Sequence, residues 1–186
     1  MSERPLALAL GVALAVASAG GCAPDAATLA GDGGAAAGPV CVSGEYWARG
    51  EDGDNWMHPG GTCIGCHDGW HRGPVFSVAG TIYHDFNEEN DCNGFPGDFS
   101  PVQDHAAIEI TDSTGTPFVI VANRVGNFYS THPLRYPLLH IRVRAPNGMI
   151  SQMSEPAPHG DCNACHTRDG TTTPTGVSPG RVVIPQ

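Results

Sequence analysis

The sequence predicts a mainly β protein: a small antiparallel β-sandwich flanked by two loop-rich segments. Three observations predict it. The 186 residues include 25 Gly and 16 Pro but only 7% aromatic residues, a composition typical of turns and short strands. Short stretches in the middle of the chain alternate apolar residues with small or polar ones. Gly, Asn and Pro separate these stretches, as they do between the strands of a sandwich.

The expected strands all lie in the segment 75–150, which is assigned to the sandwich. Each is a short alternating or apolar run bounded by turn residues: 75–83, 106–111, 118–122, 128–129 and 138–144. The last run, LLHIRVR, shows the alternation clearly, because Leu139, Ile141 and Val143 share one face. The segments on either side, 41–74 and 151–186, have the composition of loops.

The first 40 residues predict export and not folded structure. Residues 1–21 fit a signal peptide, because Arg4 precedes an apolar run too short to span a membrane. Residues 19–22, AGGC, resemble a bacterial lipobox, which implies that Cys22 is lipidated. Plain secretion and an uncleaved anchor are the alternatives. Residues 22–40 are rich in Ala and Gly and predict a flexible tether. The protein is expected in the periplasm, or lipid-anchored at the outer membrane or cell surface.

The charge of the chain argues against a nucleic-acid partner. The formal net charge is −10, and the chain has nine Arg and no Lys. No basic run or basic helix is visible, and the phosphate backbone of a nucleic acid needs such a surface.

Two copies of Cys-x-x-Cys-His are the motifs of the sequence that indicate a bound cofactor or metal. The first is Cys63 to His67, and the second is Cys162 to His166. This spacing is typical of c-type haem attachment, in which the two thiols form thioether bonds to one haem and the His binds its iron. The alternatives are a zinc site, a thioredoxin-like redox pair and plain disulfides.

The motif resembles that of cytochrome c twice over. The resemblance implies two covalently attached haem c groups, with Cys63, Cys66, Cys162 and Cys165 as attachment residues. It also implies that His67 and His166 are the proximal iron ligands, which makes segments 41–74 and 151–186 haem-binding.

Two further resemblances concern the rest of the chain. The middle segment is similar to the carboxypeptidase-regulatory-like, transthyretin-like β-sandwich, a fold that scaffolds or binds. The stretches that carry this likeness are VAGTIY (78–83), AIEITD (107–112) and VGNFY (125–129). The order of motif, sandwich, GDCNACHT and PGRV (179–182) resembles uncharacterised dihaem envelope proteins of myxobacteria.

The sixth iron ligand has several candidates near each motif. Met57 and His58 precede the first motif, and Met153 and His159 precede the second. A Met ligand raises the reduction potential relative to a second His. Core packing or loop filling is the alternative role for Met57 and Met153.

Cys41 and Cys92 remain after the motif cysteines and Cys22 are assigned. In an oxidising compartment the simplest expectation is a disulfide between them. Two unpaired thiols are the alternative.

These features predict an electron-transfer dihaem cytochrome rather than an enzyme. The chain has no Gly-x-Ser-x-Gly and no His-Glu-x-x-His motif. Envelope redox proteins are the expected partners, together with the membrane through the lipid anchor; self-assembly is left open. A dihaem peroxidase is one alternative. A β-sandwich binding lipoprotein with structural cysteines or zinc is the other.

Overall fold

The computed structural model describes residues 39–48, 53–70, 73–95, 106–173 and 176–186. The expected signal peptide, Cys22 and most of the tether lie outside these ranges. Within them, no helix is both long enough and apolar enough to cross a membrane.

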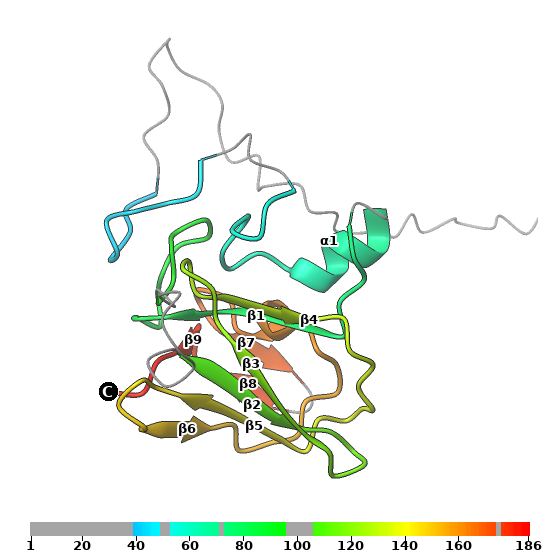
Figure 1. The fold of residues 1–186 in the computed structure, drawn as a ribbon. Helices are drawn as coiled ribbons and strands as arrows, with labels where there is room; N and C mark the ends of the chain where they lie inside the picture. Colours follow the sequence, from blue (N-terminus) through cyan, green and yellow to red (C-terminus); the bar gives the residue numbers. More distant parts are fainter. Residues whose placement is uncertain (1–38, 49–52, 71–72, 96–105, 174–175) are drawn as a thin grey trace, which may run out of the picture.

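The fold is mainly β, as predicted, and its strands form three small sheets (Figure 1). One has the order β4-β1-β9, the second β3-β2-β5-β6, and the third is the hairpin β7-β8. The elements in chain order are α1 Cys63–Trp70, β1 Val78–Tyr83, β2 Ala107–Thr111, β3 Pro117–Val121, β4 Asn127–Ser130, β5 His140–Arg144, β6 Ile150–Gln152, α2 Cys162–Cys165, β7 Thr171–Thr173, β8 Gly176–Ser178 and β9 Val182–Val183.

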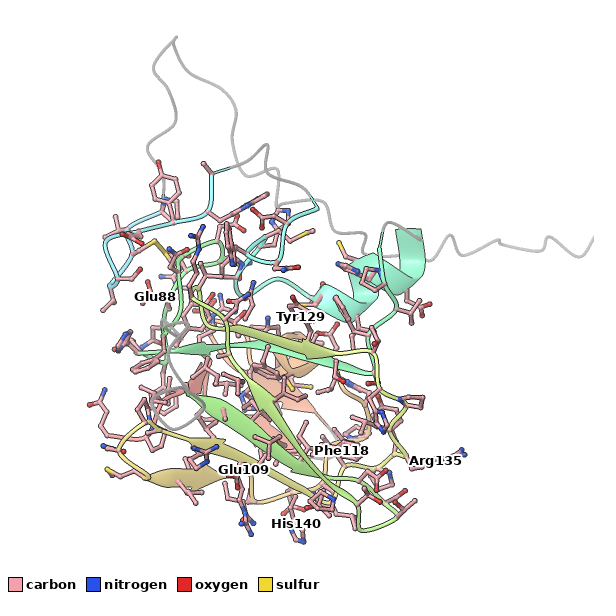
Figure 2. All side chains as sticks on the ribbon, viewed as in Figure 1. Glu88, Glu109, Phe118, Tyr129, Arg135 and His140 are labelled. Carbon is pink, nitrogen blue, oxygen red and sulfur yellow. A yellow bond between two sulfur atoms is a disulfide. The ribbon has the colours of Figure 1, made fainter. Side chains whose placement is uncertain are left out.

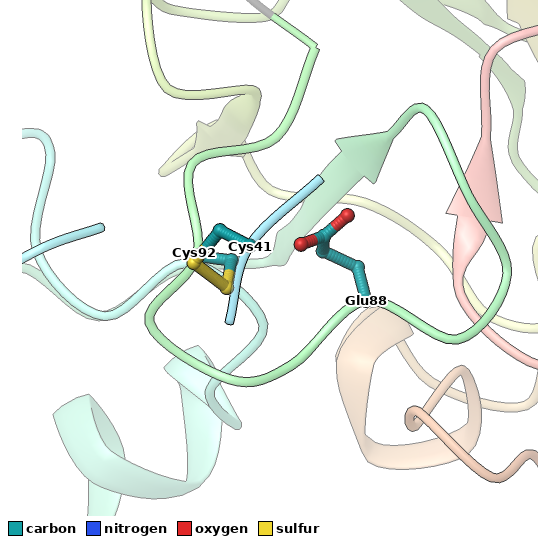
Figure 3. Close-up of side chains that lie close together, drawn as sticks. All are labelled: Cys41, Glu88 and Cys92. Atoms are coloured by element: carbon teal, nitrogen blue, oxygen red, sulfur yellow. A yellow bond between two sulfur atoms is a disulfide. The ribbon is translucent and has the colours of Figure 1, made fainter. Parts of the chain in front are cut away.

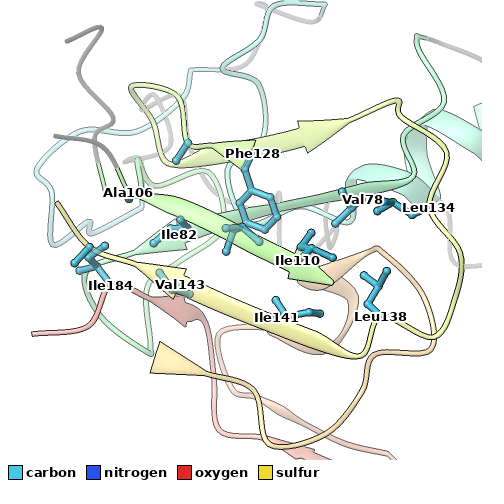
Figure 4. Packing of buried hydrophobic residues seen from close by; sticks show 13 residues of the cluster. Val78, Ile82, Ala106, Ile110, Phe128, Leu134, Leu138, Ile141, Val143 and Ile184 are labelled. Atoms are coloured by element: carbon cyan, nitrogen blue, oxygen red, sulfur yellow. The ribbon is translucent and has the colours of Figure 1, made fainter. Parts of the chain in front are cut away.

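The first two sheets pack face to face and enclose the hydrophobic core (Figure 4). Alternation along the strands decides which side chains enter it. In β2, Ile108 and Ile110 are each 1% exposed, while Glu109 between them is partly exposed. Phe128 of β4 closes the core from the opposite sheet. The result is a small sandwich that buries one face of each sheet.

Two features of the sandwich differ from the expectation. Its strand pairs are antiparallel except for β1 and β9, which run parallel. In addition, β9 comes from the segment expected to be loop-rich, and β6 begins at Ile150, at the expected boundary between segments. The reason is that Ile184, 5% exposed, packs in the core and draws the end of the chain beside β1.

The segments that carry the motifs are not wholly irregular. Each Cys-x-x-Cys-His run begins a helix, α1 in the first segment and α2 in the second. Local composition provided no sign of α1, because two of its eight residues are Gly.

A disulfide joins Cys41 to Cys92, which is the pairing that the cysteine count predicts. It ties the start of the folded part to the loop that follows β1, 51 residues later (Figure 3). Glu88 lies beside it, 3% exposed, and accepts a hydrogen bond from the backbone N–H of Val42 at 2.8 Å.

Candidate functional site

The two motifs lie next to each other, although about a hundred residues separate them in the chain. Both α1 and α2 contact β1. The backbone N–H of Gly65, inside the first motif, donates to the Asp161 carboxylate at 3.2 Å. The side-chain amide of Asn163, inside the second motif, donates to the backbone oxygen of Gly61 at 2.9 Å. The motifs therefore form one packed unit.

Both motif segments pack against strand β1. All six of its residues are buried. The backbone N–H of Ala79 donates to Gly160 O at 3.0 Å, which places the start of α2 along the edge of the strand. The Thr81 hydroxyl accepts a hydrogen bond from Gly60 N at 2.9 Å and so fixes the turn before α1.

In the first motif, α1 places Cys63 and Cys66 three residues apart, on the same side of the helix. The partly buried His67 follows directly. Its Nδ1 atom lies 2.9 Å from the backbone oxygen of Pro74, and its ring packs on Phe76 at 4.5 Å between centroids. A Cβ at Gly73 would lie 2.7 Å from the same Nδ1 atom, so only glycine allows the chain to pass this close to the ring.

In the second motif, α2 is a single turn that ends at His166. The Nδ1 atom of His166 lies 3.0 Å from the backbone oxygen of Gly180 and 2.9 Å from the Ser178 hydroxyl. Burial lowers the pKa of His166, so the imidazole is held in its neutral form. Neutral imidazole is the form that binds a metal.

The two motif histidines thus share one arrangement. A backbone carbonyl only accepts hydrogen bonds, so the proton of each ring must be on Nδ1. The lone pair is then on Nε2. Histidines that bind metals typically donate their other N–H to a carbonyl or carboxylate in this way, which fixes the tautomer and the ring orientation. His67 and His166 both fit an iron ligand by this criterion.

Two residues that link the motifs were not identified from the sequence. Asn163 is 1% exposed, accepts from Thr81 N at 3.1 Å and donates to both Gly61 O and the Thr81 hydroxyl. Asp161 is 8% exposed, and burial raises the pKa of its carboxyl. Both lie within the second motif segment. Asp161 contacts Gly65, 96 residues away, and Asn163 contacts Gly61, 102 residues away, so no local pattern points to either residue.

The motif thiols differ in state. Burial, reinforced by Asp161, raises the pKa of Cys63 to about 12 and that of Cys162 to about 12, so both are protonated at neutral pH. Cys165 is a free, partly buried thiol. Cys66 is disulfide-bonded. Because one sulfur cannot carry a disulfide and a thioether together, haem attachment at Cys66 requires that its disulfide be reduced first.

The described residues include one group with the spacing of metal ligands, and it lies outside the motifs. Among the described residues, the group whose potential ligand atoms lie within 4.8 Å of one another is Cys41, Glu88 and Cys92. Two of these three form the disulfide, so their sulfur atoms are not thiolate ligands (Figure 3).

The four candidates for the sixth ligand occupy different environments. Met57 is partly buried, and Met153 packs against the hydrophobic core. His159 is exposed. His58 has a positive φ of 44°, packs against Trp47 with 3.9 Å between ring centroids, and places its Nδ1 atom 3.0 Å from Asp91. Core packing accounts for Met153 without a ligand role, and the sixth ligands stay predictions.

Two cavities lie apart from the motifs. One, of about 380 Å³, is lined mainly by Tyr46, Trp47, Trp56 and Arg124. The other, of about 260 Å³, is on the four-stranded sheet, where Glu109, Phe118 and His140 lie far from α1 (Figure 2). Neither includes a motif residue among its lining side chains, so neither describes a substrate pocket beside the motifs.

Comparison with known proteins gives no family assignment. No protein-family model matches the chain, and no curated protein or solved structure is significantly similar to it. Its function therefore has to be inferred from the motif residues and their contacts.

Proposed function

We propose that this protein is a dihaem c-type cytochrome that transfers electrons at the bacterial cell envelope. Cys63 and Cys66 would hold one haem c, and Cys162 and Cys165 the other. The observation that carries the proposal is the shared Nδ1 anchoring of the two motif histidines, to Pro74 O at 2.9 Å and to Gly180 O at 3.0 Å.

The chain's own residues have distinct tasks in this proposal. A bound haem supplies an iron that gains or loses one electron. The cysteines would hold the group covalently, so a small sandwich would not need to enclose it. His67 and His166 would be the residues that hold the iron through Nε2, because Pro74 and Gly180 fix the other ring nitrogen.

The packing of the motifs supports electron transfer rather than substrate turnover. The bonds from Gly65 to Asp161 and from Asn163 to Gly61 bring the attachment sites together. Electrons could then pass between the two groups inside one protein.

The envelope location rests on the expected leader and on the cysteines. The Cys41–Cys92 disulfide is typical of an oxidising compartment. Lipidation of Cys22 would anchor the folded part to a membrane, where envelope redox proteins would be its partners.

One observation favours a second candidate, a β-sandwich binding protein whose cysteines are structural. Cys66 is disulfide-bonded in the structure. If that disulfide persists in the exported protein, the first motif cannot hold a haem through two thioether bonds.

Paired cysteine variants test the proposal in a host that exports the protein and attaches haem. The wild type should carry two haems, and the variants C63A/C66A and C162A/C165A should each carry one. The variant C41A/C92A is the matched control, because it removes two cysteines outside the motifs and should keep both haems. Equal haem content in all four proteins would contradict the assignment of the attachment residues.

The absorption spectrum of the wild type then separates the two haem functions. Electron transfer predicts low-spin, six-coordinate irons in both redox states. A high-spin ferric spectrum with rapid peroxide turnover would point instead to a dihaem peroxidase. A colourless wild-type protein would support the structural-cysteine candidate.

A further inference from the structure

Arg181 is a buried cation in contact with both motif segments. It stands directly before β9 and is 2% exposed. Its Nη1 atom donates to the backbone oxygen of Gly60 at 3.2 Å, three residues before Cys63. The same atom donates at 3.5 Å to the backbone oxygen of His166, the proposed iron ligand of the second motif.

The remaining donors of Arg181 hold the loop after β1. Its Nε atom donates to Glu88 O at 2.9 Å, and Nη2 donates to the side-chain oxygen of Asn90 at 2.5 Å. The guanidinium carbon also lies 5.1 Å from the centre of the Tyr83 ring. A rigid fork of several N–H donors is needed to reach four such oxygen atoms, which only arginine provides.

The part of the chain that the structure describes places no carboxylate oxygen among the hydrogen-bond partners of this guanidinium. Within the described residues all its hydrogen-bond partners are neutral oxygen atoms, three of them backbone carbonyls. Burial lowers the pKa of Arg181, while its interactions with Tyr83, Glu89, Glu88 and Asp169 raise it. A guanidinium keeps its proton at neutral pH, so a positive charge lies between the two motifs.

We propose that Arg181 is a positioning residue that joins the two haem modules and raises the reduction potential of both haems. This inference rests on the proposed function. Reduction lowers the positive charge at an iron, so a nearby buried cation disfavours the oxidised state relative to the reduced one. Arg181 also directly follows Gly180, whose backbone oxygen orients His166. Two adjacent residues therefore supply the positive charge and the hydrogen bond to the proposed iron ligand.

An isosteric substitution tests the charge without removing Arg181. Asn90→Asp places a carboxylate beside Nη2, at a residue that is itself exposed. Redox titration of the two-haem protein should show both one-electron steps shifted to lower potential. Asn147→Asp, at an exposed turn between β5 and β6, adds the same charge elsewhere and should leave both potentials unchanged.

Substitution of the arginine itself gives the second measurement. Arg181→Gln should lower both potentials further than Asn90→Asp, whereas Arg144→Gln, which removes a charge paired with Glu109 at 2.7 Å on the other sheet, should not. Arg181→Lys keeps the positive charge but loses the fork of N–H donors. It should therefore lower the free energy of unfolding while changing the two reduction potentials little.

Haem content is measured first, so that a failure of the proposed function can be told apart from a failure of the role of Arg181. A wild type without haem overturns the proposed function and this inference with it. Two haems whose potentials are the same in wild type, N90D and R181Q would overturn the role of Arg181 and leave the proposed function intact. If R181Q does not fold, N90D alone decides, because it retains the guanidinium and its hydrogen bonds.

Discussion

The Nδ1 atom of His166 lies 3.0 Å from the backbone oxygen of Gly180, fourteen residues further along the chain. This contact decides which ring nitrogen carries the proton, and it turns the Nε2 lone pair of His166 outward from that carbonyl. His67 has the same relationship with Pro74, seven residues after it. Two separate motifs therefore reach the same ring geometry through different loops.

Gly180→Ala should disturb the second motif and spare the first. Gly180 has a φ of +147°, and a Cβ there would lie 2.6 Å from the backbone oxygen of Phe86. The chain must shift, which moves the oxygen that orients His166. We expect an altered spectrum and potential for one haem of the two.

Gly115→Ala is the control for this substitution. Gly115 also has a positive φ, +81°, but a Cβ there would have no other atom within 4 Å. It should cost about 1 kcal/mol of backbone strain and leave both haem spectra unchanged. Identical spectra for G180A and wild type would contradict the role of this carbonyl.

Asn163→Ala should be strongly destabilising. The substitution leaves Thr81 N and Gly61 O buried without their partner, and each such loss costs up to a few kcal/mol. We expect a decrease of about 3 kcal/mol in the free energy of unfolding, measured by chemical denaturation. Asn147→Ala, which removes an exposed turn contact to Met149 N, should cost well under half of that. A cost no larger for Asn163 than for Asn147 would show that the motifs are not held together by this amide.

Asp112 should make stability depend on pH. The hydroxyl of Thr114, together with backbone N–H groups of Arg135, Thr114 and Thr116, lowers the pKa of its carboxyl below the ordinary 3.8. A lowered folded-state pKa means that the ionised form contributes stability above pH 3.8, and that this contribution is lost as the pH falls through the folded-state pKa.

Asp112→Asn therefore should be less stable than the wild type at neutral pH, with the difference shrinking below pH 3.8. Unfolding curves of both proteins across this range provide the measurement. A difference that does not change with pH would mean that the charge of Asp112 contributes nothing.

Removal of the Cys41–Cys92 disulfide should destabilise the fold without affecting haem content. The bridge closes a loop with a sequence separation of 51, for which chain entropy predicts about 4 kcal/mol. The variant C41A/C92A should unfold at lower denaturant than the wild type. An unchanged midpoint would show that residues near Cys41 are not fixed by the bridge.

The strands of the core were predictable because their signal is local. In β2 and β5 the alternation that buries Ile108, Ile110, Ile141 and Val143 is present in the sequence itself. Strand β9 was not predictable as a parallel partner of β1, because two residues carry no alternation and their position depends on Ile184 reaching the core.

The site was predictable in part for the same reason. The spacing of cysteine and histidine identified both motifs, since that chemistry needs neighbouring residues. Their anchoring was not predictable: contacts of Asn163, Asp161 and Arg181 span more than 80 residues, and only the folded sheet brings their partners together.

Intact mass of the exported protein tests the central claim most directly. The protein would be purified under denaturing conditions from a host with haem-attachment machinery, so that only covalently bound groups remain. We predict the mass of the processed polypeptide plus two haems. The mass of the bare polypeptide, with no thioether bond at Cys63, Cys66, Cys162 or Cys165, would contradict the proposed function.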